Sequence, residues 1–189
     1  MTFANMTWLN PPPIARVQGD TLTVTTADRT DFWRKTHYGF IRDTGHFLHH
    51  PVSGDFTAEV TIIARYEALY DQAGLMLRLD ATRWVKAGIE FTDGQPFFST
   101  VITNDRSDWS IIALPFAADR LRLRLTRHED AIRIQVRRPD GGWTMTRLGY
   151  LQAGPAQVGI MACSPERAGF VAGFHDYSCG SAIDRALHD

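Results

Sequence analysis

Lys86 and Glu90 carry opposite charges and lie four residues apart in a segment with the periodicity of a strand. Such residues project from the same face of a strand, and a rise of about 3.3 Å per residue separates them by about 13 Å. They are too far apart to pair directly, and Gly88 leaves space between them. A face of this kind would suit a ligand that offers an anionic group and hydroxyl groups. The alternative is an ordinary solvated face, because polar residues normally occupy the outer side of an antiparallel sheet.

A hairpin partner extends this polar face. Residues 73–79 and 85–91 both alternate in polarity, and a five-residue loop separates them. Directly opposed residues of an antiparallel pair share a face, so Leu79 opposite Val85 satisfies the apolar side. This register places Arg78 opposite Lys86 and brings four polar candidates to the other face: Gln72, Arg78, Lys86 and Glu90.

Aromatic residues supply three further candidates for ligand binding, Trp33, Tyr38 and Trp109. A flat aromatic ring packs against the apolar side of a sugar while its polar edge forms hydrogen bonds. Core packing is the alternative for each of them, as it is for Trp84. Trp109 is the strongest of the three because a polar segment expected to be a loop, residues 104–108, precedes it.

The catalytic motifs of common hydrolases are missing from the sequence. Two-carboxylate glycoside hydrolases that carry their acids on a strand place them at alternate positions of that strand, where both face the cleft. None of the five glutamates is followed two residues later by an aspartate, and there is no Gly-x-Ser-x-Gly segment. The remaining enzymatic alternative uses Glu90 as the acid and base, with Lys86 or Arg78 holding an anion.

Metal and cofactor sites are not indicated either. His46, His49 and His50 could supply imidazole ligands, but no carboxylate or cysteine at fixed spacing accompanies them, so we expect a surface loop or strand end there. Cys163 and Cys179 are too few for a disulfide framework and lack the spacing of a metal-binding pair. We therefore expect buried, unbridged thiols, no bound metal and no cofactor.

The charge balance restricts the partners. The 20 basic and 21 acidic residues leave a formal charge of -1, which provides no net attraction for nucleic acid. No basic segment followed by an apolar run begins the sequence, and no stretch approaches about 18 consecutive apolar residues. We expect a cytoplasmic protein that does not bind membranes.

Five arginines are expected to form a stripe on the outer face of two neighbouring strands: Arg120, Arg122, Arg124, Arg133 and Arg137. This stripe either binds an anionic partner or is simply solvated.

The elements that position these residues are strands. Alternating runs with turn residues between them cover residues 21–25, 56–65, 73–79, 85–91, 97–103, 121–127, 131–137, 158–163 and 169–177. Only residues 182–187 could form a helix, which would be short and terminal. The pattern predicts one all-β domain over residues 1–189, a two-sheet antiparallel sandwich.

Five segments also carry a family resemblance: residues 31–34 (DFWR), 38–40 (YGF), 70–76 (YDQAGLM), 84–90 (WVKAGIE) and 107–110 (SDWS). In this order and spacing they resemble the domain-of-unknown-function-1349 family, also called regulation-of-enolase-protein-1-like, over about residues 5–178. The resemblance implies a concanavalin A-like lectin/glucanase sandwich, a jelly roll with a concave sheet. It implies no established reaction.

The leading interpretation is a non-catalytic module that binds a carbohydrate, a sugar phosphate or another small polar ligand on the concave sheet. Its candidate site residues are Gln72, Arg78, Lys86, Glu90, Trp109, Trp33 and Tyr38. One alternative is an enzyme that acts on a carbohydrate or sugar phosphate through Glu90. Another is a protein-interaction domain that regulates sugar metabolism, using an exposed sheet edge or the arginine stripe. The oligomeric state is not indicated.

Overall fold

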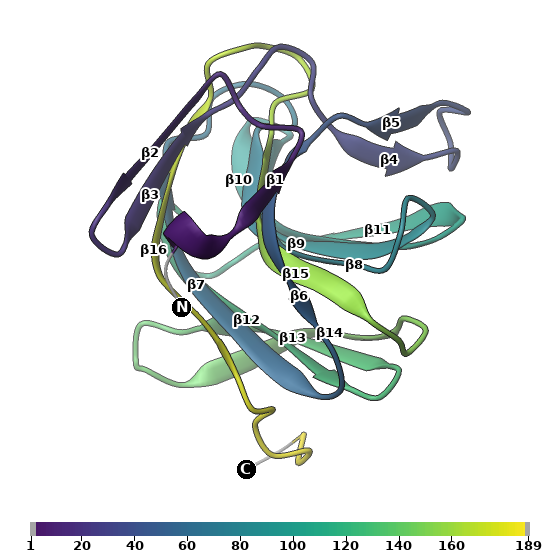
Figure 1. Ribbon diagram of the computed structural model, residues 1–189. Helices are drawn as coiled ribbons and strands as arrows, with labels where there is room; N and C mark the ends of the chain where they lie inside the picture. The colour runs from purple at the N-terminus through teal and green to yellow at the C-terminus, as the bar shows by residue number, and fades with distance from the viewer. Residues whose placement is uncertain (1–2, 188–189) are drawn as a thin grey trace.

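Two antiparallel sheets of seven strands each pack face to face (Figure 1). The computed structural model describes residues 3–187. Sheet A has the strand order β1-β6-β15-β8-β9-β10-β11, and sheet B has the order β14-β13-β12-β7-β16-β3-β2. A separate two-stranded sheet, β4–β5, projects at the upper right of Figure 1. The predicted all-β sandwich is confirmed.

The strands of sheet A are β1 (Thr7–Leu9), β6 (His46–Val52), β8 (Gln72–Arg78), β9 (Arg83–Thr92), β10 (Gln95–Asn104), β11 (Arg106–Ile112) and β15 (Ala156–Cys163). Those of sheet B are β2 (Ile14–Gln18), β3 (Thr21–Thr25), β7 (Phe56–Ala64), β12 (Arg120–His128), β13 (Ala131–Arg137), β14 (Trp143–Tyr150) and β16 (Val171–Gly180). The small sheet pairs β4 (Phe32–Arg34) with β5 (Ile41–Asp43), and Phe3–Asn5 forms a single 3-10 turn.

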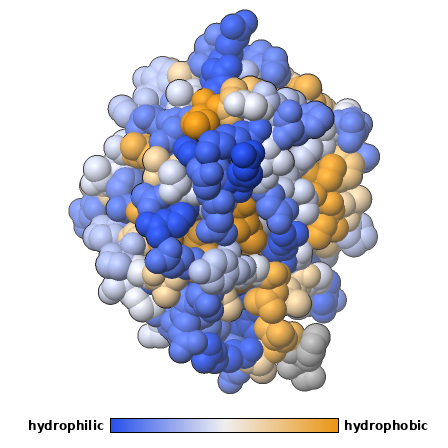
Figure 2. Space-filling view, turned by 90° about the vertical axis from the view of Figure 1, so that its right-hand side faces the viewer, coloured by the Kyte–Doolittle hydropathy of each residue, from blue (hydrophilic) through white to orange (hydrophobic). Residues whose placement is uncertain are grey.

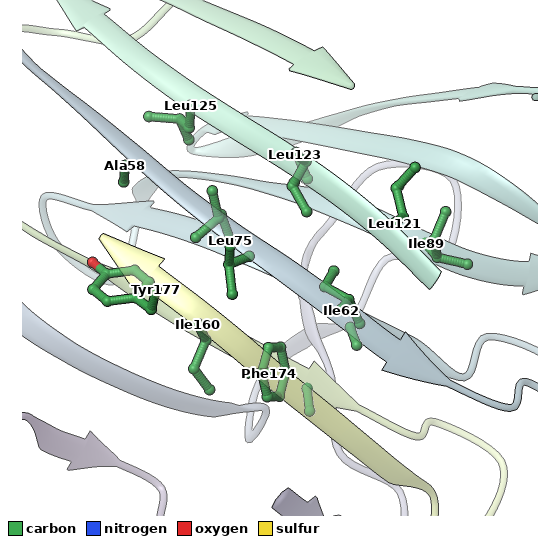
Figure 3. Packing of buried hydrophobic residues seen from close by; sticks show 14 of the residues in the cluster. Ala58, Ile62, Leu75, Ile89, Leu121, Leu123, Leu125, Ile160, Phe174 and Tyr177 are labelled. Carbon is green, nitrogen blue, oxygen red and sulfur yellow. The ribbon is translucent and has the colours of Figure 1, made fainter. Parts of the chain in front are cut away.

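Apolar side chains from both sheets fill the space between them (Figure 3). From β12 of sheet B, Leu121, Leu123 and Leu125 enter this core, because alternate residues of a strand face the same side. Leu75 of β8 and Ile89 of β9 belong to the same cluster and are completely buried. The alternation that predicts the strands therefore also predicts which face of each strand forms the core.

The predicted antiparallel pairing of β8 with β9 is confirmed, and so are the two faces of the hairpin. Leu77 and Val85 lie opposite each other in the inter-sheet core. Lys86 projects from the outer face of sheet A, where it lines a pocket. The outer face is the face expected to be concave and to carry the site.

The register of this hairpin differs from the predicted one. Leu79 was expected opposite Val85, but Arg78 pairs with Trp84, so the five-residue loop begins one residue earlier. The cause is Asp80, whose Oδ1 accepts hydrogen bonds from the backbone N–H groups two and three residues later at 2.8 and 2.9 Å. Aspartate commonly closes turns in this way. Arg78 consequently does not lie opposite Lys86.

A second apolar cluster covers the outer face of sheet A. Phe32 and Trp33 of β4 pack against side chains from five strands of that sheet: Phe47, Met76, Trp84, Val101, Met161 and Cys163. The β4–β5 hairpin therefore covers the outer face of sheet A, for which an ordinary solvated surface was one of the two interpretations of the sequence. Gln72, Lys86 and Glu90 are only 3, 3 and 6% exposed, which contradicts that alternative.

The histidine-rich segment is strand β6, paired with β1 and β15, and not the expected surface loop or strand end. His46 is buried, and its ring accepts the Ala27 N–H at 3.0 Å while its other nitrogen lies 2.7 Å from the Asn10 carbonyl oxygen. His50 bonds the Tyr177 hydroxyl at 2.8 Å. Burial lowers the pKa of His46, His49 and His50, so these rings favour their neutral form at pH 7.

The expected terminal helix over residues 182–187 is absent, and the chain is irregular there, with bends at residues 185 and 187. Its backbone groups are satisfied by side chains of sheet B, since Ile183 N–H donates to Thr57 at 3.0 Å and Arg133 donates to the carbonyl groups of Asp184 and Ala186. Across residues 3–187, no helix is long and apolar enough to cross a bilayer.

Candidate ligand-binding site

A pocket of about 170 Å³ lies on the outer face of sheet A beside the β4–β5 hairpin. Six of the seven predicted site residues line it: Trp33, Tyr38, Gln72, Lys86, Glu90 and Trp109. The remaining lining residues are Arg29, Asp31, Phe40, Arg42, Tyr70, Val101, Pro165 and Glu166. Figure 2 views the molecule from the side of Figure 1 on which β4, β5 and β11 lie, and shows a mainly hydrophilic surface with separate hydrophobic patches.

Lys86 is held at the floor of the pocket by two acceptors. Its Nζ donates to Asp31 Oδ1 at 2.9 Å and to Gln72 Oε1 at 2.7 Å. Burial by itself would lower the pKa of Lys86, but the surrounding negative charges, foremost Asp31, raise the pKa above its usual value. The ammonium is therefore charged, and one of its three N–H groups is left for a further acceptor.

Glu90 is buried at the same floor with neutral donors. Its Oε2 accepts the indole N–H of Trp109 at 3.0 Å, and Ser99 is a second hydrogen-bond partner. Burial raises the pKa of Glu90, and the charge of Lys86 together with these hydrogen bonds only partly opposes that effect. Among residues 3–187, no cationic side chain forms a direct ion pair with this carboxylate.

Aromatic rings form the walls. Trp33 meets Tyr38 and Trp109 edge to face, with ring centroids 5.7 and 6.5 Å apart. The Tyr38 and Tyr70 hydroxyls lie 3.1 Å apart, and this hydrogen bond, with burial and nearby negative charges, raises the pKa of Tyr70 to about 12. The chain reverses between β10 and β11 at a single residue, Asp105, where φ is 61°. Trp109 therefore lies within strand β11 and not after a loop. The expected polar loop over residues 104–108 is therefore largely strand.

Two glycines bring the floor strands close together. Gly74 and Gly88 face each other across β8 and β9. A Cβ on Gly74 would lie 2.0 Å from the Ala87 carbonyl oxygen, and one on Gly88 would lie 2.0 Å from that of Ala73. Neither position accepts a larger residue without moving the backbone. Gly88 also leaves no side chain between Lys86 and Glu90.

Arg78 shares the outer face with these residues but lies outside the pocket. Its guanidinium forms two parallel hydrogen bonds with the Asp43 carboxylate at 2.8 and 2.9 Å and lies over the Phe32 ring at 5.9 Å. The side chain is only 9% exposed. Arg78 therefore links β8 to the covering hairpin, and the shifted register explains why the expected place beside Lys86 is not observed.

Asp31, Tyr70 and Arg42 also line the pocket but are not among the site residues predicted from the sequence. Asp31 forms the ion pair with Lys86, Tyr70 extends the aromatic wall, and Arg42 lies at the rim. Asp31 and Tyr70 fall inside segments that carry the family resemblance, which was the one available signal for them. Nothing in the local pattern of the sequence marks Arg42.

The other candidate features are used within the fold. Along the arginine stripe, Arg122 pairs with Glu59 at 2.8 Å, and Arg124 bonds Gln135 while lying over the Trp143 ring. Both cysteines are free thiols. Within residues 3–187, no three His, Cys, Asp or Glu side chains are placed together so as to hold a metal ion.

Comparison with known proteins supplies the family. The model of the family described as "Protein of unknown function (DUF1349)" matches residues 8–182. The chain belongs to the DUF1349 family. Regulation of enolase protein 1 of Saccharomyces cerevisiae is 43% identical to this DUF1349 protein over 184 residues, which are 97% of this chain and 93% of the yeast protein. The resemblance seen in the sequence is thereby confirmed.

Two solved structures show how closely the DUF1349 fold is shared. The crystal structure of a functionally unknown protein from S. cerevisiae superposes with a TM-score of 0.94 at 40% identity, covering 97% of this chain and 100% of the yeast chain. The carbohydrate binding module CBM66 from Bacillus subtilis superposes with a TM-score of 0.62 at 16% identity, covering 94% of this chain and 98% of the module. The second likeness concerns the fold alone.

Proposed function

We propose that this DUF1349 protein binds a carbohydrate or another small polar ligand in the pocket on the outer face of sheet A. The observation that carries the proposal is the burial of two opposite charges, Lys86 and Glu90, at the floor of a pocket with aromatic walls. Charged side chains are seldom fully buried unless they are paired or functional, and the hydrogen-bond partners of Glu90 in the described part of the chain are neutral. A ligand hydroxyl would supply it with a further donor.

The walls complement such a ligand. Trp33, Tyr38 and Trp109 offer ring faces and edges against which the apolar side of a sugar ring packs. Gln72 and Lys86 offer polar groups at the floor. The fold shared with a module named for carbohydrate binding supports the proposal to the extent that the same sandwich accommodates such sites.

Calorimetric titration with neutral sugars, sugar acids and sugar phosphates tests the proposal. We expect saturable binding of at least one class, and about tenfold or greater weakening in Glu90→Gln, which loses a charge-assisted hydrogen bond. Glu129→Gln is the matched control, because Glu129 is 73% exposed and lies outside the pocket. Absence of binding across all three classes would sink the proposal.

A second candidate is an enzyme that uses Glu90 as its acid and base. The raised pKa of Glu90 favours it, because a carboxyl group that titrates closer to neutrality exchanges protons more readily near pH 7. Asp31 places a second carboxylate in the pocket. Incubation of each bound compound with the protein, followed by mass spectrometry, separates the two candidates. Turnover that Glu90→Gln abolishes supports the enzyme, and unchanged compounds support the binding module.

A regulatory role in sugar metabolism is the third candidate, favoured by the name of the yeast relative. Its simplest form is direct contact with enolase. Size-exclusion chromatography of this chain mixed with purified enolase tests it, and separate elution would exclude a stable complex. A cytoplasmic location fits the two free thiols and remains a prediction for cell fractionation.

A further inference from the structure

Two arginine side chains at the rim of the pocket form no hydrogen bond or ion pair with the residues of its floor. Arg42 lies directly opposite Trp33 in the β4–β5 hairpin, so both side chains project from the same face, and both line the pocket. Its guanidinium lies over the Phe40 ring at 5.4 Å. No carboxylate among residues 3–187 forms an ion pair with it, whereas Arg78 in the same region is fully paired. Arg42 is therefore an exposed guanidinium with its hydrogen-bond donors available.

Arg29, on the loop before β4, also lines the pocket. Its one ion pair among residues 3–187 is with the neighbouring Asp28 at 3.9 Å, and the two side chains are 75 and 64% exposed. Such an exposed, long pair contributes little and is easily exchanged for a better acceptor. The rim thus holds two guanidiniums and one carboxylate, that of Glu166.

The floor has the opposite preference. The positive charge of Lys86 is already balanced by the carboxylate of Asp31, and Glu90 adds a second carboxylate that has no direct cationic partner among residues 3–187. An anion placed beside Glu90 would meet a like charge in a buried setting, which is unfavourable. Hydroxyl groups would not, because they donate to carboxylates and accept from the remaining Lys86 N–H. This distribution of charges favours the rim, and not Lys86, as the place where an anionic group binds.

We propose that the ligand of this pocket is a polyol with one terminal anionic group, which Arg42 and Arg29 bind at the rim while its hydroxyl groups reach Glu90 and Gln72. This inference rests on the proposed function and specifies the ligand class. Guanidinium groups bind phosphate and carboxylate alike in a bidentate manner, so sugar phosphates and sugar acids share the required chemistry. A rim contact in solvent is also weakened by salt.

Matched triplets of glucose and galactose test the inference, each as the neutral sugar, its uronic acid and its 6-phosphate. We expect at least one anionic member to bind about tenfold or more tightly than its neutral parent, and Arg42→Gln to remove that advantage. Arg42→Gln should weaken the binding of the anionic members much more than that of the neutral sugars. Arg16→Gln, which alters an exposed arginine of β2 outside the pocket, should behave as the wild type.

The outcomes separate this inference from the proposed function. If neutral sugars bind as tightly as their anions and Glu90→Gln weakens both, the pocket binds carbohydrate and the rim contact is wrong. If Arg42→Gln weakens neutral and anionic members equally, Arg42 shapes the pocket and does not select charge, which also overturns the inference. If no triplet binds, both proposals fail. A uronic acid that binds where the phosphate does not, or the reverse, identifies which anion the rim selects.

Discussion

Lys35 and Lys86 are the only lysines of the chain, and each forms one ion pair. The Lys35 side chain is 33% exposed and pairs with Asp105 at the surface, whereas that of Lys86 is 4% exposed and pairs with Asp31 at the floor of the pocket. Removal of one partner from a buried pair leaves an uncompensated charge, which is far less favourable than the loss of a surface pair. The two sites thus provide a matched comparison.

We expect Lys86→Met to lower the free energy of unfolding by about 3 kcal/mol, because Asp31 loses its counter-charge. Lys35→Met should lower it by less than about 1 kcal/mol. Urea unfolding at pH 7 measures both. The double variant Lys86→Met/Asp31→Asn should recover part of the loss, and equal effects of the two single variants would show that the Lys86 pair is not desolvated. Glu90→Gln, not Lys86→Met, is consequently the suitable probe of binding.

The raised pKa of Glu90 makes a prediction about the pH dependence of stability. A carboxyl group with a folded pKa above its unfolded value, which is about 4.3, contributes fully to stability below that value and loses this contribution as the pH rises through the folded pKa. Glu90→Gln does not titrate, and its amide oxygen still accepts the Trp109 indole N–H. The stability of Glu90→Gln relative to the wild type should therefore rise with pH above about 4.3. Urea unfolding between about pH 4 and 8 measures this difference, and parallel curves for the two proteins would contradict it.

Part of the site is predictable from the sequence because it depends on neighbouring strands alone. Period-two alternation brings Gln72, Lys86 and Glu90 to one face whatever the rest of the chain does. The ion pair of Lys86 is different, since Asp31 is 55 residues away and reaches Lys86 only when the β4–β5 hairpin folds over sheet A. Burial of these residues follows from the same long-range packing. No local pattern encodes it.

At the level of elements, Gly88 sets the spacing of β8 and β9. An added Cβ would lie 2.0 Å from the Ala73 carbonyl oxygen, so Gly88→Ala must displace a paired strand. We expect it to lower the free energy of unfolding by about 3 kcal/mol, the upper part of the range for overpacking. Gly180→Ala in β16 is the control, because no atom lies within 4 Å of its added Cβ, and it should stay within about 0.5 kcal/mol of the wild type. A tolerated Gly88→Ala would mean that the floor strands can separate.

The strand that the sequence conceals most fully is β6. His46, Phe47 and Leu48 are all buried, with Phe47 in the outer cluster and Leu48 in the inter-sheet core. Both faces of β6 are covered, so the alternation that reveals a half-exposed strand is missing. The hydrogen bonds of His46 replace the solvent that a surface histidine would have. The histidines of this segment therefore suggest an exposed loop, although packing on both faces makes it a buried strand.

For the whole molecule, the sequence predicts two layers and the structure has a third, partial one. Sheet A is enclosed by the inter-sheet core on one side and by the cluster under β4–β5 on the other. The strands of the covering hairpin have only three residues each, too short for a periodic signal, and Phe32 and Trp33 anchor the hairpin by packing on sheet A. The same hairpin bounds the pocket on the outer face of sheet A.

The stability of this third layer can be measured with adjacent residues of β8 that face opposite sides. Leu75 lies in the inter-sheet core and Met76 in the outer cluster, and both are completely buried. We expect Leu75→Ala and Met76→Ala each to lower the free energy of unfolding by about 2–5 kcal/mol, through lost burial and the cavity that remains. Met145→Ala on β14, at a methionine that is 38% exposed, should change it by about 0.5 kcal/mol or less. Denaturant unfolding of the three variants, measured side by side, tests this expectation. If Met76→Ala changes the free energy of unfolding as little as Met145→Ala does, the hairpin does not bury the outer face of sheet A, and the description of the pocket floor as buried is wrong.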